Sequence, residues 1–157
     1  MKDRILSVLT RLFGYRFDGT LKLANIAEGT HVDSVTKLAD AAITTRYLLV
    51  KEGTDVDHIA TCGADECPVG VCEDEPSAAE MPVNVALFGC AQRTRKMVAS
   101  EEISSMALVY TAADGKVQDE PAVAGTYYRV GRALTAASTD GDEIEVDPYP
   151  PLAFEVS

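Results

Sequence analysis

The chain has 157 residues, of which 46% are hydrophobic and 25% are charged. A chain of this length is expected to form one domain with at most an added arm. Lysine and arginine total 14 against 25 aspartate and glutamate residues, which gives a net charge of -11. Because nucleic-acid binding draws its affinity from basic side chains, this charge argues against a nucleic-acid partner.

The first residues differ from the rest of the chain in charge and in pattern. Residues 1–16 have a net charge of +3, so the residues after them carry -14. Apolar side chains in this segment recur at the spacing of one helix face; they are Ile5, Val8, Leu9, Leu12 and Phe13. The pattern predicts an N-terminal amphipathic helical arm within residues 1–20. Since a helix of about ten residues is marginal in water, the arm must dock on its own domain, on another copy or on a partner.

Neither a membrane span nor a secretory signal is indicated. No apolar run approaches the roughly 18 residues of a spanning helix, so no membrane partner is expected. Arg11 interrupts the apolar part of the N-terminal segment, and no small-residue cleavage site follows it. We therefore expect synthesis in the cytoplasm, with free thiols instead of a disulfide scaffold. The four thiols belong to Cys62, Cys67, Cys72 and Cys90.

From about Leu21 onward, short strand-like segments alternate with glycine, proline, aspartate and asparagine. The predicted strands cover residues 21–24, 42–51, 58–62, 69–72, 83–88, 95–99, 107–111, 116–118, 127–137 and 143–147. Many short strands at this spacing are typical of all-β domains. The sequence thus predicts a mainly β fold, a small antiparallel β-barrel or β-sandwich over residues 21–148, with residues 149–157 as a C-terminal tail.

Asp114 and Gly115 mark the clearest turn. They stand between the apolar segment VYTAA and the short segment KVQ. An Asp-Gly pair suits a tight hairpin, because both central residues of that turn have positive φ. We expect a hairpin at this point.

An acidic stretch and a basic triplet follow each other in the middle of the chain. Residues 52–80 contain nine acidic residues and neither lysine nor arginine. They lack the fixed alternating offsets of a calcium loop, so a solvated rim of loops is the ordinary interpretation. Arg93, Arg95 and Lys96 come next. They can meet the acidic loops of a neighbouring copy, although a solvated edge strand protected by charge is the ordinary interpretation.

Candidates for chemistry are few. His58, Cys62, Cys67 and Cys72 are possible zinc ligands, but their spacing is looser than that of the usual paired cysteines. Buried cysteines acting as small apolar residues are the ordinary alternative. A nucleophile pair of His58 with Cys62 or Cys90 lacks a recognisable oxyanion site. Phosphate-binding glycine motifs are also missing. We therefore assign no catalytic, cofactor-binding or metal-ligating residues, and an interaction module is favoured over an enzyme.

Several segments, in their order along the chain, resemble one protein family. They include an opening NIAEGTH, a P-x-G-V strand before an acidic turn, the hairpin VYTAADGK and the later GTYYRVGRAL. Together, from about Asn25 to Asp147, they resemble the capsid cement or head decoration proteins of tailed bacteriophages and prophages. The N-terminal arm and the segment YPPLAFEVS lie outside this resemblance.

The resemblance implies a non-enzymatic structural virion protein, made in the host cytoplasm and placed on the outer surface of the capsid. Its implied partners are the major capsid protein, whose subunits it would bridge and stabilise, and itself, as a homotrimer. A head fibre or receptor-binding appendage is the alternative, and a Cys-dependent or zinc-containing enzyme is a remote one. As interaction residues we propose the five apolar arm residues together with the basic triplet: Ile5, Val8, Leu9, Leu12, Phe13, Arg93, Arg95 and Lys96.

Overall fold

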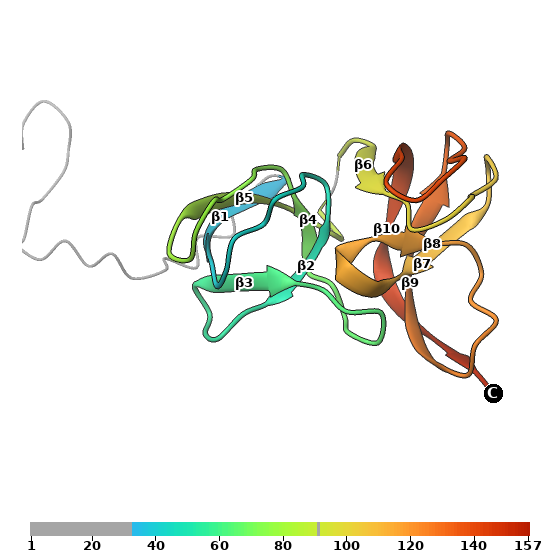
Figure 1. The fold of residues 1–157 in the computed structure, drawn as a ribbon, viewed down its shortest axis with the longest axis horizontal. Coiled ribbons are helices and arrows are strands. Elements are labelled where there is room, and N and C mark those ends of the chain that lie inside the picture. Colours follow the sequence, from blue (N-terminus) through green and yellow to red (C-terminus); the bar gives the residue numbers. More distant parts are fainter. Residues whose placement is uncertain (1–32, 91) are drawn as a thin grey trace, which may run out of the picture. The chain divides into compact units, whose positions relative to one another are not determined.

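The computed structural model describes residues 33–90 and 92–157, and these residues form two β-sheets (Figure 1). The mainly β prediction is therefore confirmed. The predicted arm within residues 1–20 and the predicted strand 21–24 lie outside the described residues. Within the described part of the chain, no helix is long and apolar enough to cross a membrane.

The first five strands close into a barrel in the order β1-β3-β2-β4-β5. They are β1 (Ser34–Ala39), β2 (Leu49–Glu52), β3 (His58–Thr61), β4 (Gly70–Cys72) and β5 (Pro82–Leu87). The barrel was predicted to be antiparallel, and four of its five strand pairs are. The exception is the pair β1 and β3, which run parallel and place Ala39 beside Ile59.

The remaining strands form an antiparallel sheet in the order β6-β10-β9-β7-β8. They are β6 (Arg95–Val98), β7 (Leu108–Thr111), β8 (Val117–Gln118), β9 (Gly125–Ala133) and β10 (Glu143–Val156). A single 3-10 turn, η1 (Ala113–Gly115), joins β7 to β8. The strand β6 lies at an edge of this sheet, as the charged triplet predicted.

Two apolar cores hold these sheets. One core fills the barrel and includes Val50, Cys72 and Val85. The other joins a barrel wall to the second sheet, and there Leu49, Val71 and Ala86 meet residues of the second sheet. Each of these barrel residues is adjacent in sequence to a residue of the first core: Leu49 to Val50, Val71 to Cys72 and Ala86 to Val85. Because successive residues of a strand point to opposite faces, β2, β4 and β5 are buried on both sides.

Most predicted strands differ from the observed ones in their bounds, and the largest changes are at β2, β9 and β10. The strand β9 begins two residues earlier and ends four residues earlier than the predicted segment 127–137. The strand β1 was not predicted; Lys37, in its middle, interrupts the apolar pattern. The predicted strand 42–51 shrinks to β2, because Tyr47 has a φ of 65° and turns the chain just before Leu49. Ile43 nevertheless remains buried in the barrel core without forming a strand.

The last strand continues beyond the predicted end at residue 147. After an irregularity between Pro148 and Leu152, β10 pairs with β9 again as far as Val156. Residues 149–156 of the segment set apart as a tail therefore lie in β10. The opposite edge of β10 pairs with β6 only from Glu143 to Val146 among the described residues. Prolines stand at positions 148, 150 and 151 of β10. Because proline lacks the backbone N–H that a neighbouring strand would need, it is usually found on strand edges that are not paired.

Candidate functional site

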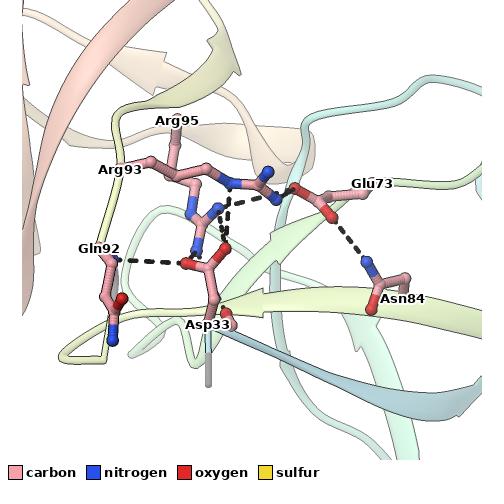
Figure 2. A network of polar contacts seen from close by, with 6 residues as sticks. All are labelled: Asp33, Glu73, Asn84, Gln92, Arg93 and Arg95. Carbon is pink, nitrogen blue, oxygen red and sulfur yellow. Dashed lines mark hydrogen bonds and ion pairs between the residues drawn. The ribbon is translucent and has the colours of Figure 1, made fainter. Parts of the chain in front are cut away.

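A buried arginine joins the barrel to the second sheet (Figure 2). Arg95, in β6, has a side chain that is only 3% exposed. Its Nη1 lies 3.2 Å from Asp33 Oδ2, and its Nη2 donates to Asp33 Oδ1 and to the Asp33 carbonyl. Glu73, which follows β4, places Oε1 3.7 Å from Arg95 Nη1. One guanidinium thus holds two acids of the barrel.

The acids of this network are themselves fixed by further contacts. Glu73 Oε2 accepts a hydrogen bond of 2.6 Å from Asn84 Nδ2, in β5. Arg93 Nε forms an ion pair with Asp33 Oδ2 at 3.0 Å, and Arg93 Nη2 donates to Glu73 Oε1 at 3.1 Å. The hydrogen bond from Arg95, supported by its charge, lowers the pKa of Asp33. The lowered pKa keeps the Asp33 carboxylate ionised, which is the form that pairs with the two arginines.

The structure divides the basic triplet instead of presenting it as one surface. Arg95 is buried on acids of its own chain, so the interpretation as a solvated edge does not hold for it. Arg93 is 61% exposed while paired with the same acids. Lys96 is 57% exposed, and its Nζ lies 2.7 Å from Glu143 Oε2 and 5.2 Å from the centre of the Tyr47 ring. Arg93 and Lys96 are therefore the two members that remain accessible.

The predicted turn forms a second connection between the two sheets. Asp114 and Gly115 both have positive φ, 58° and 72°, which confirms the turn prediction. The Gly115 N–H donates to the Cys62 carbonyl of the barrel at 2.7 Å. A Cβ at Gly115 would lie 2.7 Å from the Leu49 carbonyl oxygen, so the tip of the hairpin packs directly on barrel backbone.

His58 lies between two carboxylates at the start of β3. Its Nδ1 is 2.6 Å from Asp55 Oδ1, and its Nε2 is 3.1 Å from Glu80 Oε1. The hydrogen bond with Asp55, followed by the one with Glu80, raises the pKa of His58. Both ring nitrogens face carboxylates, which does not match the zinc arrangement considered from the sequence. Among the described residues, no three His, Cys, Asp or Glu side chains gather as metal ligands.

A pH dependence follows for His58. Because the folded state raises its pKa, the protonated ring stabilises the protein fully below the unfolded value of about 6.5. That stabilisation is lost as the pH rises through the folded value. The melting temperature of the native chain should therefore exceed that of His58→Gln most at pH 6 and less at pH 9. A difference that stays constant over this range would show that the protonated ring has no role.

The cysteines differ in exposure, and none is in a disulfide among the described residues. Cys62 and Cys72 are buried, Cys90 is partly exposed and Cys67 is exposed. Burial raises the pKa of Cys62 to about 12 and also raises that of Cys72. The Cys62 thiol donates to the carbonyls of Gly63 and Glu66, so it lies turned into the adjacent loop.

Thiol labelling should follow these exposures, since the reactive form is the accessible thiolate. With DTNB, Cys67 should react first, and Cys62 and Cys72 should react only after unfolding. All four thiols should titrate in urea. The fast phase should disappear in Cys67→Ser. Fewer than four thiols in urea would contradict the free-thiol assignment.

The comparisons with known proteins identify the family. A family model described as "Phage cement protein" matches residues 25–148, most of the chain. The chain belongs to the phage cement protein family. The resemblance seen in the sequence is thereby confirmed, and the chain is a structural protein of the phage head.

A solved structure shares the fold of this chain. It is the N base of the head fiber gp8.5 of bacteriophage phi29, with a TM-score of 0.56 and 17% sequence identity. The likeness covers 79% of this chain and 97% of that one. At this identity it shows the fold alone. No curated protein sequence matches the chain.

The proposed interaction residues of the chain lie in two settings. Five of them lie outside the described residues, and these are Ile5, Val8, Leu9, Leu12 and Phe13. The basic triplet lies on β6 and before it. Sequence reasoning missed the link from Arg95 to Asp33, 62 residues apart. The side-chain alternation along β6 could have predicted that Arg95 is buried. Residues two apart on a strand share a face, and Met97, two residues after Arg95, is fully buried.

Proposed function

We propose that this protein is a capsid cement that binds the outer surface of the assembled head and joins neighbouring major capsid subunits. The observation that carries the proposal is the family match over residues 25–148. The described body supports it, because shared core packing, the Arg95 network and the Gly115 turn all tie the barrel to the second sheet. A body tied together in this way can transmit force between two capsid subunits.

The mechanism that we propose is reinforcement by repetition. A standard protein interface buries about 1,600 Å², and one such contact repeated over the shell gives an avidity that no single contact supplies. A protein that binds only the intact shell also stabilises it, since any ligand of one state favours that state. Such a role needs no catalysis, and we propose that the protein has none.

The N-terminal arm has a place in this proposal as a contact between chains. Both apolar cores are built from residues of the described ranges, 33–90 and 92–157. The arm carries a charge of +3, which opposes the -14 of the remaining residues. We propose that it ties copies to each other or to the shell, and that the copies assemble as a trimer.

A head fibre base is the second candidate function. It is favoured by the fold shared with the head fiber N base, 97% of which is covered. A fibre base and a cement protein differ in copy number, because a cement protein covers the lattice whereas a fibre needs only its attachment points.

Sedimentation with undecorated shells tests the proposal. Purified protein should bind expanded heads to a saturable copy number, and it should not bind free capsid subunits. Decorated shells should also withstand higher temperatures than bare ones. A small number of copies per shell would favour the fibre base, and binding without saturation would exclude the cement role.

A further inference from the structure

The barrel opens at one end into an apolar cavity of about 200 Å³. We call this opening the barrel mouth; its rim consists of Val35, Lys37, Glu52, Val56, His58, Val69 and Leu87. Its floor includes Ile59 and Val85, both buried in the barrel core. All five strands or residues next to them contribute, so the cavity continues the interior of the barrel.

The size of the barrel mouth suits a side chain more than a small-molecule ligand. Ligand pockets usually measure about 300 to 1,000 Å³, whereas an apolar cavity of about 150 Å³ holds one benzene ring. Val56 is 61% exposed and Val69 is 37% exposed, so the rim leaves apolar surface open. One aromatic or leucine side chain matches the volume of the cavity, and the residues next to it in the bound segment would contact the rim.

The charges near the barrel mouth favour a basic partner. Glu52 lines the rim, and Asp55 and Asp57 flank Val56 in the same exposed loop. Lys37 and His58 also line the cavity; the Lys37 Nζ donates to the Val56 carbonyl, and the His58 ring nitrogens face Asp55 and Glu80. A segment with apolar side chains and a positive charge therefore complements this surface.

We propose that the barrel mouth receives residues 1–17 of a neighbouring copy, with an apolar side chain of the arm, such as Phe13, entering the cavity. The inference rests on the proposed role of the arm between copies and names the surface that the arm binds. The arm offers five apolar side chains at helical spacing and a charge of +3 over residues 1–16. Residues 18–32 can span at most about 50 Å when extended, which is enough to reach an adjacent body.

Peptide binding tests this docking directly. A labelled peptide of residues 1–17 is titrated into the full chain carrying Leu9→Asp and Phe13→Asp, so that its own arm does not compete. The peptide should bind, and Val56→Asp or Val69→Asp in the receiving chain should weaken binding at least tenfold. Val123→Asp, at a valine that is 72% exposed outside the barrel mouth, is the matched control and should leave binding unchanged. A peptide carrying Phe13→Asp should bind weakly to every chain.

Three outcomes would overturn the inference. These are no binding of the peptide, equal binding to the Val56→Asp, Val69→Asp and control chains, and a native chain that stays monomeric at all concentrations while blocking the peptide. The last result would mean that each arm occupies the barrel of its own chain. Saturable binding of the same variants to shells, measured separately, would show that the cement role stands even when the docking fails.

Discussion

Replacing Gly115 with valine should lower the melting temperature of the protein by about 12 °C. A positive φ at a β-branched residue costs about 1 to 3 kcal/mol, and forcing a side chain against packed neighbours costs about 1 to 3 kcal/mol more. Both apply, because Gly115 has a φ of 72° and its Cβ would lie 2.7 Å from the Leu49 carbonyl oxygen. A loss of about 4 kcal/mol corresponds to that temperature shift at roughly 3 °C per kcal/mol.

Gly141 provides the matched control for this substitution. Its φ is 89°, and no atom lies within 4 Å of the position that a Cβ would take. Gly141→Val should therefore carry only the backbone strain, about 1 to 3 kcal/mol. Calorimetry of Gly115→Val and Gly141→Val compares their losses of stability, and so separates backbone strain from the clash of the new side chain with the barrel. Equal losses would mean that the tip of the hairpin does not press on the barrel.

Replacing Arg95 with methionine should destabilise the protein by about 3 kcal/mol at pH 7. Removing one partner of a buried ion pair leaves the other charge without compensation, and here Asp33 and Glu73 would lose their shared guanidinium. Arg93→Met removes an arginine that contacts the same two acids but is 61% exposed. It should cost less than about 1 kcal/mol, as exposed pairs do. Urea unfolding of both variants measures the difference.

The effect of Arg95→Met should also depend on pH. Because Arg95 lowers the pKa of Asp33, the pair stabilises the folded state fully above the unfolded value of about 3.9. The contribution is lost as the pH falls through the folded value. The gap between the native chain and Arg95→Met should therefore narrow from pH 5 to pH 2.5. A gap of unchanged size would assign the loss to packing of the arginine stem and not to the ion pair.

Local signals predicted much of the fold. The Asp114-Gly115 pair marked its turn because few residue pairs accept two positive φ values. Alternating apolar residues marked most strands of both sheets. The misplaced boundaries have tertiary causes. Tyr47 adopts a positive φ that its residue type does not favour, and the irregular part of β10 holds three prolines, which a sequence pattern associates with loops.

The candidate site was less predictable from the sequence. The basic triplet was visible, but charge alone does not tell an exposed arginine from one that binds two acids in the interior. The partners of Arg95 come from residues 33 and 73, on separate parts of the barrel. Such pairings depend on how the barrel packs against the second sheet. The barrel mouth was also missed, because its residues become neighbours only when the strands close into a barrel.

Electron cryo-microscopy of shells saturated with this protein tests the cement role most directly. Each copy should appear as density for the described body on the outer surface, in contact with at least two neighbouring capsid subunits. Such density should recur at equivalent positions over the whole lattice. Density that contacts a single subunit, or that occupies only a few attachment points, would contradict the account.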